Sequence, residues 1–178
     1  MAAKKERATV KSAATKAKPA AIAAPAARLA VTASVVAVAP APVRDRSTIV
    51  GLIARLRDPD AETARDAAET LGRLPADDEA VGALCAAVRN ADGFFHPVVR
   101  TAAAATLGLL GDRRAVEALI AGTSDTMAEA SEEAIKALGL LGDARAVAAL
   151  EAAIRNDNGF FLEHVRTAAR DALGKIQR

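Results

Sequence analysis

The sequence contains no tryptophan and no tyrosine, only four phenylalanines and a single cysteine. Without large aromatic residues the core has to be built from aliphatic side chains. Ala, Arg and Leu are the most frequent residues, and because all three favour helices, we expect an all-α fold. The lone Cys85 excludes an intramolecular disulfide and a cysteine-based metal cluster. It lies within a helical apolar pattern, and we expect an inert, buried thiol.

The charge is unevenly distributed along the chain. Residues 1–46 carry nine Lys or Arg and two acidic residues, whereas residues 47–178 carry 15 basic and 20 acidic residues. A low-complexity, basic Ala/Lys/Pro-rich arm (1–46) is therefore joined to a mildly acidic body (47–178).

The arm has few large apolar residues and four prolines, so we expect it to be disordered or extended. One interpretation is a plain solvated tail. Another is a tail that contacts nucleic acid or an acidic partner, through Lys4, Lys5, Arg7, Lys11, Lys16 and Lys18. A third is a signal segment over residues 1–42, which would export a protein that we otherwise expect in the cytoplasm. The apolar run over residues 29–39 is too short to span a membrane.

The body repeats a Leu-Gly pair, at Leu71-Gly72, Leu107-Gly108, Leu138-Gly139 and Leu173-Gly174, with spacings of 36, 31 and 35 residues. An alanine stands four residues before each Leu and an aliphatic residue three residues after it. Steps of four and three residues place these groups on one helical face. This pattern predicts four equivalent helices over residues 60–74, 97–110, 127–141 and 162–177.

A further helix is expected before each of these four. The first runs from Ile49 to Arg57, and the other three carry the apolar residues Val81, Leu84 and Val88, then Val116, Leu119 and Ile120, then Val147, Leu150 and Ile154. Asp60, Asp112 and Asp143 stand where their carboxylates can cap helices. We therefore expect eight helices in four antiparallel pairs, with repeats at about 47–75, 76–111, 112–142 and 143–178.

This pattern resembles the HEAT repeat, and more closely the HEAT-like repeats named after phycobilisome lyases. The resemblance is carried by residues 99–116, repeated over 134–147 and in part over 165–176. It implies a right-handed α-solenoid whose second helices line a concave face. It does not specify a function, because the family includes scaffolds, chromophore-lyase subunits, hydroxylases and appended domains of peptidases.

No catalytic arrangement is recognisable, and we expect neither a cofactor nor a metal site. The HEAT-like hydroxylases bind iron through repeated His-Glu pairs, but His96 and His164 occupy non-equivalent repeat positions. A subunit of a lyase-like enzyme that acts on a chromophore or cofactor remains an alternative.

The four phenylalanines lie in two copies of a Gly-Phe-Phe phrase, Phe94-Phe95 and Phe160-Phe161, in the links inside repeats two and four. Either the rings cover the ends of the core, or at least one ring of each copy is exposed and anchors a partner. Because the copies are two repeats apart, we expect them on the same edge.

Two arginines, Arg100 and Arg166, occupy equivalent repeat positions. Either they form a structural ladder with acids such as Asp112 and Asp143, or they bind an anionic group of a partner.

Two residues after the aligned leucines stand Arg73, Leu109, Leu140 and Lys175. This position is turned away from the core stripe by about 200°. Leu109 and Leu140 therefore form a central apolar strip, which is either covered by superhelical packing or open to a partner.

These observations favour a non-catalytic scaffold, adaptor or assembly factor that binds another protein. The contact would use the concave face or the Gly-Phe-Phe edge. Nucleic-acid association is possible through the arm only, because the acidic body disfavours it.

Overall fold

A computed structural model describes residues 46–155 and 163–178 of the chain. The described residues form eight α-helices, two short 3₁₀ helices and no strand. The α-helices are α1 (Arg46–Arg55), α2 (Ala61–Arg73), α3 (Asp78–Arg89), α4 (Pro97–Leu110), α5 (Val116–Gly122), α6 (Ala128–Leu141), α7 (Val147–Arg155) and α8 (Glu163–Ile176); the 3₁₀ helices are η1 (Arg113–Ala115) and η2 (Ala144–Ala146). The expected all-α architecture of eight helices is confirmed.

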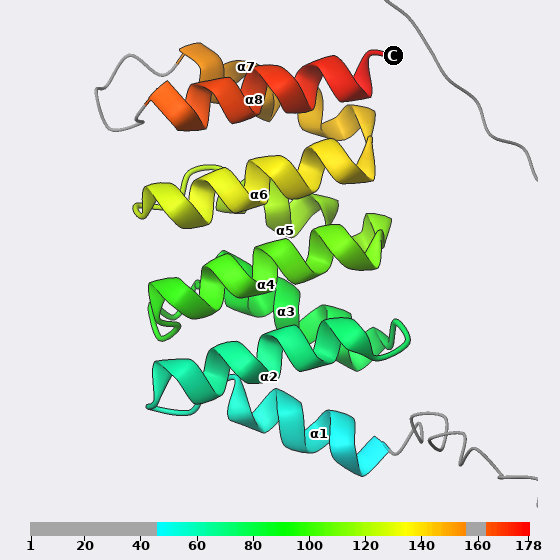
Figure 1. The fold of residues 1–178 in the computed structure, drawn as a ribbon, viewed down its shortest axis with the longest axis vertical. Helices are drawn as coiled ribbons and strands as arrows, with labels where there is room; N and C mark the ends of the chain where they lie inside the picture. Colours follow the sequence, from blue (N-terminus) through cyan, green and yellow to red (C-terminus); the bar gives the residue numbers. More distant parts are fainter. Residues whose placement is uncertain (1–45, 156–162) are drawn as a thin grey trace, which may run out of the picture. The chain divides into compact units, whose positions relative to one another are not determined.

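The even-numbered helices α2, α4, α6 and α8 lie side by side in chain order, with α3, α5 and α7 behind them (Figure 1). Each even-numbered helix packs on the next, and each also packs on the helix that precedes it in the chain. Stacked hairpins of this kind form a helical solenoid, in which every repeat buries its apolar side against its neighbours.

The core contains the residues that the repeated motif places on one face of each helix. Leu71, Leu107 and Leu138 are fully buried, as are the alanines four residues before them. Burying a leucine stabilises the fold by roughly 1.5–3 kcal/mol. The fourth leucine, Leu173, is only partly buried. It lies in α8, after which no further helix is described.

The glycines of the motif permit close contact between neighbouring helices. A Cβ atom added at Gly108 would lie 2.8 Å from the Cβ and 2.9 Å from the Cα of Ala137, and Gly139 meets Ala172 at the same two distances. A side chain at either glycine would collide with the backbone of the next helix. A Cβ added at Gly174 would meet no atom within 4 Å.

The three expected aspartate caps are present. Asp60 accepts a hydrogen bond from the backbone N–H of Thr63 at the start of α2. Asp112 and Asp143 cap η1 and η2, the single 3₁₀ turns that lead into α5 and α7. The guanidinium of Arg145, bonded to Asp143, lowers the pKa of that carboxyl to about 2.

The Cys85 thiol is buried as expected, and burial raises its pKa. None of the helices in the described ranges is long and apolar enough to cross a bilayer.

Candidate partner-binding face

An uncharged strip runs along the exposed side of α4. The only charged residue of this helix is Arg100, which is buried. Val98, Ala102, Ala105 and Leu109 follow one another at steps of four, three and four residues, so they share one helical face. None of the four is fully buried, and Leu109 at the end of the strip is 80% exposed.

The neighbouring helix α6 extends this strip with Leu140, which is 59% exposed. Its Cδ1 atom lies 3.4 Å from the position of a Cβ added at Gly108, so the side chain rests over the seam between α6 and α4. Leu109 and Leu140 are therefore open to solvent, and superhelical packing does not cover them. We call Val98, Ala102, Ala105, Leu109 and Leu140 the apolar strip.

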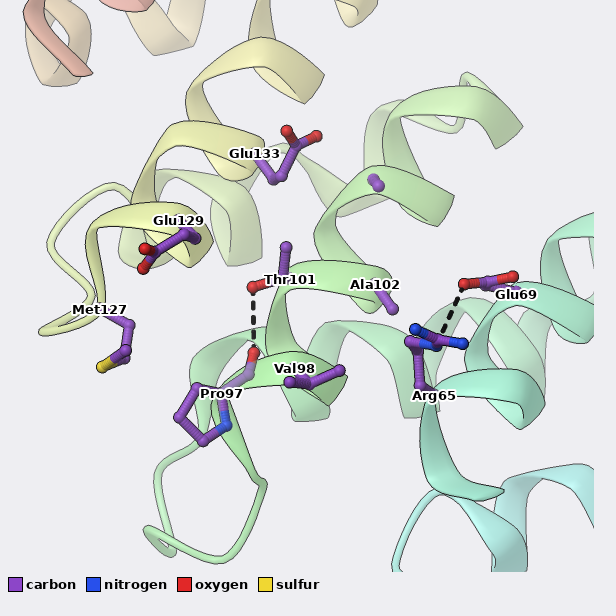
Figure 2. Close-up of a pocket in the computed structure, with 10 residues that line it drawn as sticks. Arg65, Glu69, Pro97, Val98, Thr101, Ala102, Met127, Glu129 and Glu133 are labelled. Carbon is purple, nitrogen blue, oxygen red and sulfur yellow. Dashed lines mark hydrogen bonds and ion pairs between the residues drawn. The ribbon is translucent and has the colours of Figure 1, made fainter. Parts of the chain in front are cut away.

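A hollow of about 500 Å³ lies over the first three turns of α4. Figure 2 shows its floor on α4, with one wall on α2 and the other on α6. Its lining comprises Arg65 and Glu69 on α2, Pro97, Val98, Thr101, Ala102 and Ala105 on α4, and Met127, Glu129 and Glu133 at the start and on the exposed side of α6.

The walls of the hollow carry charged groups, which are partly paired with one another. Arg65 lies 3.6 Å from Glu69 and 2.9 Å from Glu62 on its own helix. Lys136 lies 2.8 Å from Glu133 on α6. Its pKa is raised because it donates to the carboxylates of Glu132 and Glu133. The basic groups beside the hollow are therefore already engaged with carboxylates.

Between α6 and α8 the surface changes character. A second hollow of about 660 Å³ is lined mostly by polar and charged side chains from these two helices. His164 on α8 and Glu132 on α6 approach within 3.3 Å across it. The hollow between α6 and α8 therefore differs from the one over α4, whose floor is uncharged.

Arg100 has a different partner from those expected. Its Nε and Nη2 atoms donate to the two carboxylate oxygens of Asp125, at 2.6 and 2.7 Å, and Nη1 donates to the carbonyl oxygen of Phe95 at 2.8 Å. The expectation of Asp112 or Asp143 was wrong, because those carboxylates bind Arg114 and Arg145, two residues further along the chain.

The buried Arg100–Asp125 pair therefore joins the first turn of α4 to the link between α5 and α6, and the bond to Phe95 adds the link between α3 and α4. Because Arg100 is buried and satisfied, it is not available to an anionic partner. Its equivalent, Arg166, is partly exposed on α8, with Nη1 3.9 Å from a carboxylate oxygen of Glu163.

The first Gly-Phe-Phe copy has one buried and one exposed ring. Phe95 is 6% exposed and Phe94 is 55% exposed. The two rings meet edge to face at 5.8 Å between centroids. The guanidinium of Arg57 lies 5.6 Å from the centroid of Phe94 and 5.5 Å from that of Phe95, within the range of a cation–π contact. In this copy Phe95 therefore belongs to the core and Phe94 is exposed, and a role of Phe94 as an anchor for a partner stays a prediction.

Two groups of expected site residues lie outside the described part of the chain. They are the second aromatic pair, Phe160 and Phe161, and the basic residues of the arm, Lys4, Lys5, Arg7, Lys11, Lys16 and Lys18. The expectation that both aromatic pairs share one edge therefore stays a prediction.

The two histidines are not brought together. His96 is the N-cap of α4, where its Nδ1 atom accepts from the backbone N–H of Val98 at 3.4 Å. His164 faces α6 across the second hollow. Across residues 46–155 and 163–178, no cluster of three His, Cys, Asp or Glu side chains is placed to hold a metal ion.

The family model for HEAT repeats matches residues 49–119 and again residues 94–174. The two matches together span more than two thirds of the chain, so the protein belongs to the HEAT-repeat family. A comparison with curated proteins gives no match.

The sequence pattern predicted Leu109 and Leu140 at the end of the apolar strip, but it did not predict Val98, Ala102 and Ala105 along the rest of it. Two features of the sequence indicate the uncharged strip and the acidic wall beside it. The 14 residues of α4 contain one charge, and Glu129 and Glu133 are spaced by four residues, so they share one face of α6. The placement of Glu69 on the facing wall depends on the packing of α2 against α4.

Proposed function

We propose that this protein is a non-catalytic scaffold that binds a partner protein across the exposed side of its even-numbered helices. The observation that carries this proposal is the apolar strip, which ends in two leucines that are 80% and 59% exposed. Contiguous apolar surface bordered by charge is typical of interaction sites. A solenoid suits this role because it offers an extended surface on a repetitive frame.

The energetics favour the strip as the centre of the contact. Covering one exposed leucine contributes roughly 1.5–3 kcal/mol when its burial is complete. Leu109 and Leu140 lie at adjoining ends of α4 and α6, so one partner side chain can contact both. A few side chains at the centre of a protein interface carry most of its binding energy, and the surrounding charges disfavour mismatched partners.

The observations favour the scaffold over the other interpretations. The resemblance to phycobilisome-lyase repeats is a likeness of repeats, and the lining of the two hollows supplies no recognisable group for chromophore chemistry. An enzyme subunit is therefore not proposed. Contact of the basic arm with nucleic acid stays a separate hypothesis, and it predicts binding that weakens steeply with salt.

The test uses the full chain as bait for proteins of its own cell, with retained proteins identified by mass spectrometry. We expect the double variant Leu109→Glu/Leu140→Glu to lose the partners that the unaltered chain retains. The control is Val50→Glu, which places one glutamate at a 50% exposed apolar residue of α1. It should retain them. Circular dichroism checks that both variants fold. Partner sets that are identical for all three chains would refute the strip as the binding site.

A further inference from the structure

We propose that a helix of the partner lies along α4, in the groove that the hollow over α4 forms between α2 and α6. This helix is amphipathic, and its apolar side is bordered by lysine or arginine. This inference rests on the scaffold function proposed above and adds the chemistry of the occupant. Three features of the groove support it: its width, its small uncharged floor and the sign of the charge on its walls.

The width of the groove suits a single helix. Packed helices have axes about 8–10 Å apart, so α2 and α6, which flank α4, are separated by roughly 16–20 Å. A helix with its side chains is about 10–12 Å across. An incoming helix that lies along α4 therefore rests on top of α4, with the exposed side chains of α2 and α6 on either side of it.

The floor of the groove allows a close approach. Ala102 and Ala105 present single methyl groups, and the hydroxyl of Thr101 donates to the carbonyl oxygen of Pro97 at 3.0 Å (Figure 2). A helix resting there leaves no hydroxyl donor of the floor unpaired. Small side chains also let the facing helix place its own larger apolar groups into the hollow, with Leu109 at the far end as a further contact.

The walls select a basic occupant. The charged residues that line the groove are three acids, Glu69, Glu129 and Glu133, and one base, Arg65. Arg65 and Lys136 already lie within 2.9 Å of carboxylates of their own helices. Among the described residues, none forms an ion pair with Glu129. Lysine or arginine side chains on the border of an incoming helix that faces α6 therefore meet the opposite charge of Glu129 and Glu133.

The probe is a synthetic peptide with the 14-residue length of α4, built from leucine and lysine in an amphipathic helical pattern and labelled with a fluorophore. Two comparison peptides replace every lysine with glutamate, or shuffle the order so that the apolar face is lost. Binding to the full chain is followed by fluorescence anisotropy at physiological ionic strength. We expect the Leu/Lys peptide to bind at least about tenfold more tightly than either comparison peptide, a difference of about 1.4 kcal/mol.

Charge variants of the groove locate the contact. Glu129→Lys/Glu133→Lys should raise the Kd of the Leu/Lys peptide at least about tenfold, and the milder Glu129→Gln/Glu133→Gln should raise it by a smaller factor. The matched control is Glu117→Lys/Glu151→Lys, which makes the same change in net charge on α5 and α7. It should change the Kd by less than about threefold, because exposed charges beyond a Debye length are screened. Circular dichroism checks the fold of each variant.

Several results would overturn the inference. One is equal binding of the basic and acidic peptides, and another is an equal effect of the groove and control variants. A third is self-association of the chain that the groove variant abolishes, since a second copy would then be the occupant. A fourth is at least tenfold tighter peptide binding after Lys4, Lys5, Arg7, Lys11, Lys16 and Lys18 are all changed to Gln, since the chain's own basic residues would then compete for the site.

The failure of this inference and the failure of the scaffold function are distinguishable. If the peptide results fail but Leu109→Glu/Leu140→Glu still abolishes partner capture, the scaffold stands and its partner lacks the proposed basic helix. If the leucine variant captures every partner normally, the scaffold site itself is refuted.

Discussion

Alanine at the repeated Leu-Gly glycines should change stability in opposite directions at different repeats. The two glycines to compare are Gly108 on α4 and Gly174 on α8. In a helix, replacing glycine with alanine is intrinsically favourable by about 1 kcal/mol. At Gly108 the added methyl group would lie 2.8 Å from the Cβ of Ala137 and 2.9 Å from its Cα, closer than van der Waals contact allows. At Gly174 it would meet no atom within 4 Å.

The expected magnitudes follow from these two terms. Overpacking a closely fitted interface costs about 1–3 kcal/mol. The obstacle at Gly108 is the Cα of Ala137, which is backbone, so the helices have to move apart and the cost should be near the upper end. The net effect of Gly108→Ala is then a loss of about 1–2 kcal/mol. Gly174→Ala should gain up to about 1 kcal/mol, and somewhat less because the residue is near the end of α8.

Urea unfolding of the full chain, followed by circular dichroism at 222 nm, measures both changes. Gly139→Ala should reproduce the loss, because Gly139 meets Ala172 at the same distances as Gly108 meets Ala137. Gly82→Ala in α3 serves as a control, since a methyl group there meets no atom within 4 Å and should be stabilising. If Gly108→Ala and Gly174→Ala shift the midpoint equally in the same direction, the reasoning from close helix packing is refuted.

Three further predictions concern single contacts. Asp125→Ala should destabilise the fold by about 3–5 kcal/mol in urea unfolding, because Arg100 is then buried without its carboxylate; a loss below about 1 kcal/mol would contradict this. Phe95→Ala should cost about 3–5 kcal/mol in the same assay and the exposed Phe94→Ala no more than about 1, so equal costs would contradict the assigned burial. The native pKa of Asp143 is lowered from 3.8 to about 2, so its contribution to stability is complete above pH 4 and is lost as the pH falls towards 2. Asp143→Asn should therefore flatten the pH dependence of unfolding in that range, and an unchanged profile would count against the assigned contact.

The local features of the fold were predictable because they depend on neighbours in the sequence. The expected helix over residues 97–110 coincides with α4. Its start follows from Pro97 at the first helical position and its end from Gly111, whose φ of 68° favours glycine. The aspartate caps were found for the same reason, since a cap and the N–H group that it accepts from are two or three residues apart.

The candidate site was only partly predictable. The position of Leu109 two residues after the aligned leucine indicated that its side chain points away from the core. Whether it is covered depends on the neighbouring helices, and the structure leaves it 80% exposed. The partner of Arg100 could not be predicted from the sequence. Its partner Asp125 is 25 residues away and lies in a link whose path the repeated motif does not specify.

The sequence by itself determined the all-α class, the repeated unit and the side of each helix that faces the core, because helical periodicity is a property of neighbouring residues. The tertiary structure alone decided what each repeated residue contacts. Gly108 and Gly174 occupy the same place in the motif, yet α6 packs against Gly108 and no atom lies within 4 Å of a Cβ at Gly174. The groove over α4 likewise exists only because α2 and α6 pack on either side of an uncharged helix, and that arrangement brings together residues from three separate repeats.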